Sequence, residues 1–168
     1  MSKETHELGR EEVLGHPALT DPQTGLANRL HFELVYRYLF AAGDRGMAFT
    51  IMLLSIGGAG EDDPDGLRAI GQTIHRTTRA SDLVAHAGGD RCVVLLLGTN
   101  LPGARIAADR IEGALRASGY EPVSIGLATF NASMKDSGAL LRSVEAALAV
   151  AEKAGGGVEM APAGSEDQ

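Results

Sequence analysis

Two oppositely charged residues, Arg79 and Asp82, stand three positions apart in this chain and shortly before a Gly88-Gly89 pair. A guanidinium pairs with phosphate oxygens or with guanine O6 and N7, while a carboxylate accepts from guanine N1–H and N2–H. At this spacing, Arg79 and Asp82 could therefore bind two different edges of one guanine base. A structural role is also open, because a cation favours a helix C-terminus and an Asp can accept from turn amides.

A β-hairpin is predicted directly after Asp82. Two short apolar runs, 83–87 and 93–97, flank Gly88-Gly89, where a two-residue primed turn requires positive φ. Cys92 is the only cysteine and falls on the second strand, which excludes an internal disulfide. We expect Cys92 to be a small packing residue rather than a nucleophile.

The remaining periodicities predict an α/β fold in which helices flank a mixed central β-sheet. The expected helices cover 22–42, 65–78, 102–118 and 137–154, and the expected strands cover 48–56, 82–97 as the hairpin, and 122–130. The first helix carries an aromatic stripe made of Phe32, Tyr36, Tyr38 and Phe40. Such a stripe is typical of a core or of a dimer contact.

Composition predicts one ordinary domain. The chain has 168 residues, 44% of them hydrophobic, and a net charge of −7 that disfavours nucleic-acid binding. The start of the chain lacks a signal-peptide pattern and no apolar run reaches membrane-spanning length, so we expect a cytoplasmic protein without membrane insertion. The expected organisation is a polar extension over 1–20, a domain over 21–160 and a flexible tail over 161–168.

Four motifs follow one another along the chain in the order in which one known protein family carries them. Asp21–Arg29 is similar to the family's D-x-L-T-G-L-x-N-R, with Gln23 in place of Leu. The turn Gly88-Gly89-Asp90-Arg91-Cys92 resembles Gly-Gly-Asp-Glu-Phe, and 123–128 is similar to the v-S-I-G-v-A strand. The segment 146–155 resembles the closing helix. Together these motifs resemble the bacterial GGDEF family. The resemblance implies the α/β sandwich of diguanylate cyclases, which condense two GTP molecules into cyclic di-GMP.

The resemblance fails at the residues that the family uses for catalysis. Ser55 stands where the family has a metal-binding Asp, and Arg91 stands at the hairpin Glu. The Lys and Arg that bind the triphosphate would fall at Glu152 and Gly156. The segment after the first strand is about eight residues short, which removes the family's guanine-reading Asn and Asp. The sequence therefore predicts no catalytic residues, no metal and no cofactor, and thus not an enzyme.

Two other features invite a metal interpretation. The acidic run 61–65 is a candidate replacement metal site, and the alternative is a solvated turn in which Asp63 or Asp65 caps the next helix. His75 and His86 lack a second ligand at metal spacing, which favours surface or packing roles.

The resemblance also implies a second, inhibitory ligand site. In the family it is an R-x-x-D motif, which corresponds here to Arg79 and Asp82, with a helper arginine at Arg110. The resulting hypothesis is a catalytically inactive GGDEF domain that binds cyclic di-GMP and signals to an unidentified protein partner. The alternative is a ligand-independent interaction scaffold, or a homodimer formed through the first helix. Residual GTP binding or residual diguanylate cyclase activity is a third hypothesis, which the replaced residues disfavour.

Overall fold

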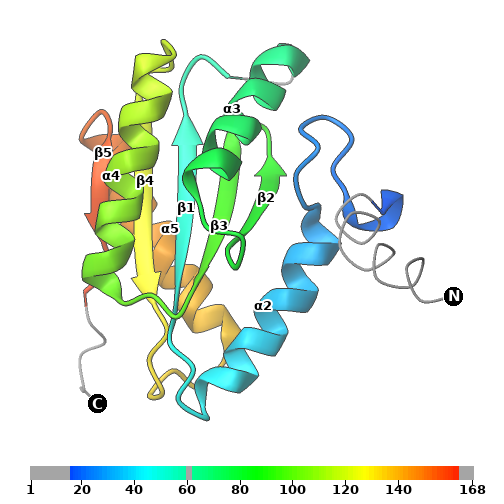
Figure 1. Ribbon diagram of the computed structural model, residues 1–168. Helices are drawn as coiled ribbons and strands as arrows, with labels where there is room; N and C mark the ends of the chain where they lie inside the picture. Colours follow the sequence, from blue (N-terminus) through cyan, green and yellow to red (C-terminus); the bar gives the residue numbers. More distant parts are fainter. Residues whose placement is uncertain (1–15, 60–61, 163–168) are drawn as a thin grey trace, which may run out of the picture.

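The computed structural model describes residues 16–59 and 62–162 and contains one five-stranded sheet in the order β2-β3-β1-β4-β5 (Figure 1). The elements are η1 (Pro17–Leu19), α2 (Arg29–Gly43), β1 (Phe49–Ile56), α3 (Pro64–Thr77), β2 (Leu83–Gly88), β3 (Arg91–Leu97), α4 (Leu101–Ala117), β4 (Val123–Thr129), α5 (Ser137–Lys153) and β5 (Gly157–Met160). The predicted α/β class is confirmed.

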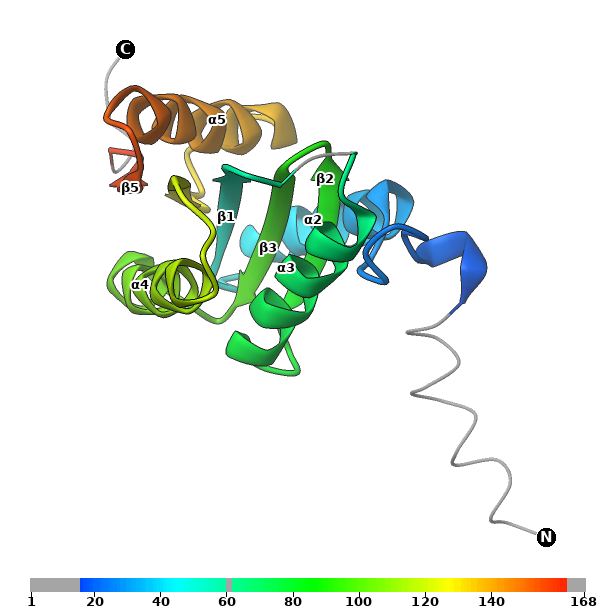
Figure 2. The same ribbon diagram turned by 90° about the horizontal axis from the view of Figure 1, so that it is seen from above.

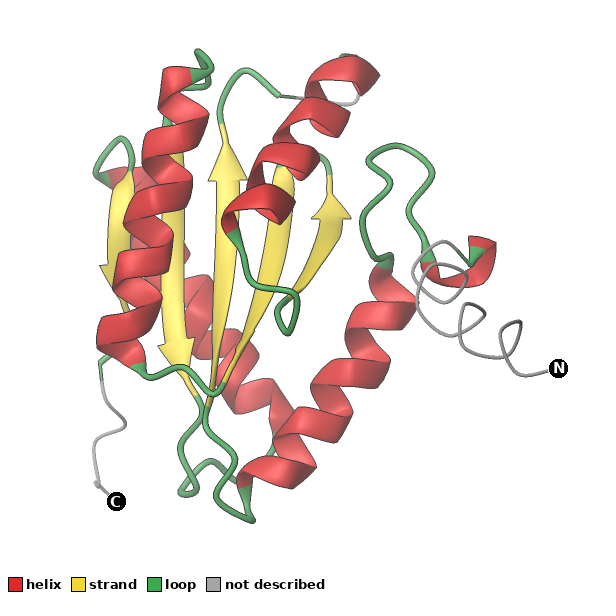
Figure 3. Cartoon of the chain, viewed as in Figure 1, coloured by secondary structure: helices red, strands yellow, loops and turns green. Residues whose placement is uncertain are grey.

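The sheet separates two layers of helices (Figures 2 and 3). β1 is the central strand and pairs antiparallel with both β3 and β4, whereas β5 pairs parallel with β4. Because side chains alternate along a strand, Met52 and Leu54 join one core with α3 and α4. Ile51 and Leu53 join a second core with α2 and α5. Both faces of β1 are therefore buried.

The first helix begins at Arg29, so the predicted start at residue 22 is wrong. The preceding residues fold back as a turn, in which Thr20 bridges Ala27, and Ala27 also bridges Ala85 of β2. The Asn28 side chain then accepts from the N–H of His31 and caps α2. These bridges use the backbone of the turn in sheet-like pairing, which excludes helix there.

The hairpin is confirmed, with Gly88 and Gly89 at φ 96° and 53° and a bulge between His86 and Gly88. Strand β5 was not predicted. It is four residues long and begins at Gly157, which has φ 104°. Such a short segment shows no alternation of apolar and polar residues that would predict a strand. Its position depends on parallel pairing with β4, a contact that is made only in the tertiary fold.

The aromatic stripe of α2 divides between two environments. Phe32, Tyr36 and Phe40 point inward and join Phe49 and Phe130 in a chain of ring contacts. The Tyr36 hydroxyl donates to the carbonyl of Ser137 at the start of α5. Burial first, and then the charge of Asp136, raise the pKa of Tyr36 to about 12. Only Tyr38 is exposed, at 70%.

Within 16–59 and 62–162, no helix is both long and apolar enough to cross a membrane. The predicted extension over 1–20 and tail over 161–168 lie mostly outside these ranges. The described part of the extension includes η1, and Ala161 donates its N–H to Leu127 of β4.

Candidate functional site

The hairpin end of the sheet brings together three of the residues at which the chain departs from the GGDEF pattern. Arg91, at the start of β3, donates to the Glu152 carboxylate near the end of α5 at 3.3 Å. Ser55 of β1 donates to the Asp90 carboxylate at 3.4 Å, because β1 and β3 place Ser55 opposite Arg91. A cation therefore lies where a carboxylate was expected, and a carboxylate lies where a cation was expected.

The charges at this end of the sheet suit neither a divalent cation nor a triphosphate. Arg91 would repel Mg²⁺, and its guanidinium is already paired with Glu152. Glu152 would in turn repel phosphate oxygens. In the described ranges, no group of three or more His, Cys, Asp or Glu residues is placed to hold a metal ion. The residues present do not fit the two-metal chemistry of the family.

Cys92 lies directly after Arg91 and is buried, with 2% of its surface exposed. Burial raises the pKa of its thiol to about 12, and the carboxylates of Asp21 and Asp90 contribute further. The thiol is therefore protonated at neutral pH and unreactive, in agreement with the predicted packing role.

Arg79 and Asp82 lie in the turn between α3 and β2 and are in contact. The Asp82 carboxylate accepts from the backbone N–H of Arg79 at 3.0 Å and from that of Leu97 at 3.3 Å. Its side chain is 2% exposed, whereas that of Arg79 is 63% exposed, and Arg79 Nε lies 3.6 Å from Asp82 Oδ2. Arg79 Nη2 also donates to Thr99 Oγ1 at 2.5 Å. Asp82 thus holds the turn, and Arg79 faces solvent.

The structure does not bring the predicted helper into this contact. Arg110 is exposed on α4 and makes no hydrogen bond or ion pair with any described residue.

The acidic run after β1 acts at least partly as a helix cap. Asp63 accepts from the N–H of Gly66 at 3.0 Å and is the N-cap of α3. Asp65 lies in the first turn of α3, where a negative charge favours the helix dipole. The capping interpretation is confirmed for Asp63, while Glu61 lies outside the described residues.

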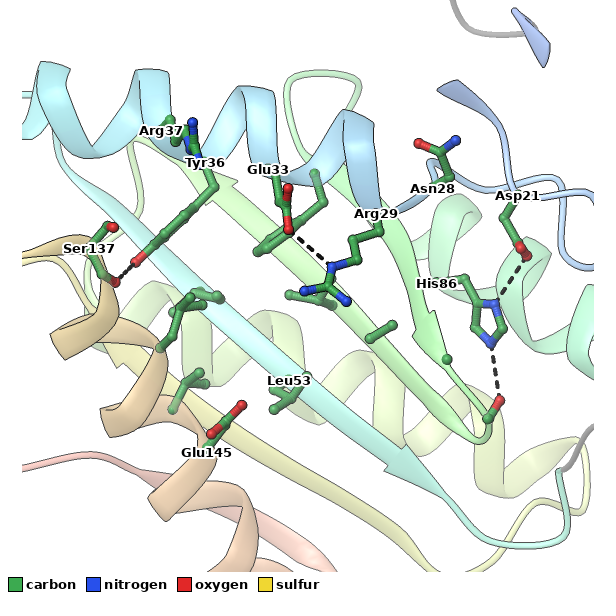
Figure 4. Close-up of a pocket in the computed structure, with 18 of the residues that line it drawn as sticks. Asp21, Asn28, Arg29, Glu33, Tyr36, Arg37, Leu53, His86, Ser137 and Glu145 are labelled. Atoms are coloured by element: carbon green, nitrogen blue, oxygen red, sulfur yellow. Dashed lines mark hydrogen bonds and ion pairs between the residues drawn. The ribbon is translucent and has the colours of Figure 1, made fainter. Parts of the chain in front are cut away.

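Sequence reasoning missed a groove of about 750 Å³ between α2 and α5 (Figure 4). Ile51, Leu53 and Val93 of the sheet form its floor, and Phe32 is on one wall. At one end His86 is 5% exposed and Nδ1 lies 3.1 Å from Asp21 Oδ2, while Nε2 lies 3.0 Å from the Gly89 carbonyl. Both imidazole nitrogens are used internally, which supports the packing role predicted for His86.

The groove could not be found from periodicity, because its floor residues were predicted only as buried strand positions. It exists because α2 and α5 cover the same face of the sheet without meeting along their whole lengths. The Tyr36–Ser137 hydrogen bond joins them at one end.

Comparison of the chain with protein-family models and with solved structures agrees with this architecture. The family model for the diguanylate cyclase GGDEF domain matches residues 60–157, and the chain therefore belongs to the GGDEF family. No match was found among curated proteins.

Three solved structures are similar in fold. The GGDEF domain of DgcB from Caulobacter crescentus, in complex with c-di-GMP, is 19% identical, with a TM-score of 0.77 over 87% of this chain and 97% of that chain. Diguanylate cyclase SiaD from Pseudomonas aeruginosa, in complex with its activator SiaC, is 21% identical, with a TM-score of 0.81 over 94% of this chain and 66% of that chain. The GGDEF domain of YfiN (TpbB) from Pseudomonas aeruginosa is 25% identical, with a TM-score of 0.70 over 83% and 98%.

Proposed function

We propose that this chain is a catalytically inactive GGDEF domain that binds cyclic di-GMP at the turn of Arg79 and Asp82. The ion pair between Arg91 and Glu152 is the observation that supports the absence of catalytic activity. It reverses the sign of charge at two positions on which the family's phosphoryl transfer depends. Stabilising a transferring phosphoryl group requires cations, and here the guanidinium is neutralised by its own carboxylate.

The proposal that cyclic di-GMP binds rests on the different roles of the two turn residues, Asp82 and Arg79. The Asp82 side chain is buried and accepts from two backbone N–H groups, so it acts as a positioning residue. Arg79 is held over this turn by its contacts with Asp82 and Thr99, and 63% of its side chain stays exposed. A planar guanidinium in that position can pair with phosphate oxygens or with the O6/N7 edge of a guanine. Complexes of family members with c-di-GMP, such as that of DgcB, support this choice of ligand.

Calorimetric titration with cyclic di-GMP tests the ligand. We expect micromolar or tighter binding that weakens at least tenfold in Arg79→Ala, which corresponds to the ~1.5–3 kcal/mol of a charge-assisted hydrogen bond. The matched control is Arg105→Ala, since Arg105 is also partly exposed and paired with an acid, Asp109. Absence of heat with wild-type protein, or equal weakening by both variants, would refute the site.

A separate assay tests inactivity. Wild-type protein incubated with GTP and Mg²⁺ is expected to form no cyclic di-GMP by chromatography, and a titration with GTP and Mg²⁺ is expected to give no heat. Formation of product would overturn the inactive assignment while leaving the ligand site to be judged by its own titration.

A second candidate function is a protein-interaction domain that pairs with another copy of the chain through α2. Leu30, Leu34 and Tyr38 recur every four residues on α2 and are 50%, 56% and 70% exposed. Sedimentation of wild type and Leu34→Asp tests this, with Ile106→Asp as the control because Ile106 is equally exposed on α4, at 57%. A dimer that only Leu34→Asp dissociates supports pairing, whereas a monomeric wild type refutes it.

A further inference from the structure

A second, smaller hollow of about 320 Å³ lies between α3 and the turn that precedes α2. One side is the outer face of α3, with Arg68, Gln72, His75 and Arg76, and the other side is the segment 24–26. The turn and α3 lie side by side in both views of the fold (Figures 1 and 2). Two arginines, an amide and an imidazole thus line the hollow, and none of its lining residues is acidic.

Two contacts hold the turn against α3. Leu26 is 6% exposed and packs over Gly71, where an added Cβ would come within 3.1 Å of the leucine side chain. One turn earlier in α3, Arg68 Nη2 donates to the carbonyl of Pro22 at 3.3 Å. These contacts fix both walls of the hollow before any ligand arrives.

The positive charge of the hollow is not neutralised by the described part of the chain. Arg68 meets a carbonyl rather than a carboxylate, and Arg76 forms no hydrogen bond or ion pair with a described residue. Asp65 precedes Arg68 by one turn without forming an ion pair with it. The carboxylate of Asp21 is directed elsewhere, to Thr24 and His86. A local cationic surface thus persists on a chain of net charge −7.

We infer that this hollow binds the phosphate group of a small anionic ligand. Arg68, Gln72 and Arg76 follow one another at intervals of four residues, which places them on one face of α3. The first and last Cα atoms are roughly 12 Å apart along a helix, a span that two arginine side chains close over one or two phosphate groups. The Gln72 amide supplies further donors between them. The volume suits a phosphate or pyrophosphate rather than a whole dinucleotide.

The hollow is a different site from the Arg79 turn, and its ligand does not depend on the proposed function. An anion would relieve the repulsion between the two guanidinium groups and satisfy donors that otherwise face water. The ligand class includes free pyrophosphate and the terminal phosphates of a nucleotide, which share the same recognition chemistry.

Titration of ¹⁵N-labelled protein with inorganic pyrophosphate tests the inference, with shifts followed for the backbone N–H groups of 23–26 and of α3 and for arginine Nε–H. Shifts confined to these groups, saturating below a few millimolar, are expected. The double variant Arg68→Ala/Arg76→Ala should weaken binding at least tenfold. Both side chains are exposed, so the variant should fold, and unchanged chemical shifts in the core verify this. Because Arg68 also bonds to Pro22, Arg76→Ala alone is the second variant: it removes no contact of the turn and should also weaken binding. Arg105→Ala is the matched control and should bind as wild type.

Three outcomes would overturn the inference: no saturable shifts, shifts spread over all exposed arginines, or equal weakening by Arg105→Ala. Parallel titrations with ADP and with pyrophosphate distinguish a nucleotide from free pyrophosphate as the ligand. Tighter binding of ADP indicates that a nucleoside is also recognised. Arg79→Ala should leave the pyrophosphate titration unchanged, and the double variant should leave the cyclic di-GMP titration unchanged. The failure of one site is therefore distinguishable from the failure of the other.

Discussion

Replacing Asp82 by alanine is expected to destabilise the domain far more than replacing Arg79. The Asp82 side chain is 2% exposed and accepts from the N–H groups of Arg79 and Leu97 at 3.0 and 3.3 Å. Its removal leaves two donors without their acceptor, at about 1–1.5 kcal/mol each, for a total of about 2–3 kcal/mol. Arg79→Ala removes a side chain that is 63% exposed, with its ion pair to Asp82 and its bond to Thr99, which predicts about 1 kcal/mol or less.

Urea unfolding and thermal unfolding, both monitored by circular dichroism, measure this difference as a free energy and as a Tm. For a domain of this size, 2–3 kcal/mol corresponds to a decrease in Tm of roughly 5–10 °C for Asp82→Ala. Asp82→Asn is the matched control, because the amide keeps one acceptor oxygen, and it should fall between wild type and Asp82→Ala. If Asp82→Ala were within 0.5 kcal/mol of wild type, Asp82 would not be the residue that holds this turn. Loss of cyclic di-GMP binding in that variant would then report direct contact with the ligand.

Three further predictions follow from buried and paired groups. Cys92 should resist iodoacetamide in the folded protein and react after denaturation, as mass spectrometry would show. Because the pKa of its thiol is raised from 9.0 to about 12, the free energy of unfolding should fall by about 1.4 kcal/mol per unit as the pH rises above about 9. A Cys92→Ala variant that kept the same slope would contradict this. Gly126→Ala should prevent soluble expression or cost more than about 3 kcal/mol in urea unfolding, because its Cβ would lie 2.5 Å from the backbone nitrogen of Leu148, and wild-type stability would refute this contact. For Arg91 and Glu152, whose side chains are 44% and 35% exposed, a double-mutant cycle with alanine should give a coupling of about 0.2–1 kcal/mol that decreases with salt, and a zero coupling would argue against the pair.

Local patterns predicted most of the elements. β1 had a continuous apolar run, the hairpin had paired glycines, and α4 and α5 had clear apolar stripes, so their predicted ends differ little from the observed ones. The predicted start of α2 was wrong because the segment before it has helix-compatible residues. In the fold this segment is held by two β-bridges, one between Thr20 and Ala27 and one between Ala27 and Ala85. β5 was missed because four residues after a glycine run carry no periodic signal.

Sequence alone determined which chemical groups this protein has: a serine and an arginine in place of two carboxylates, an Arg–x–x–Asp turn, and one cysteine on an apolar strand. Residue identity and short-range spacing are properties of the chain, and they are sufficient to predict which of the family's residues are replaced. Only the tertiary structure decided what these groups do. It paired Arg91 with Glu152, distant in sequence, buried the Asp82 carboxylate on a backbone amide of β3, and set two arginines of α3 against the turn before α2. Each of these contacts depends on how strands and helices pack across long separations, and that packing has no signature in local spacing.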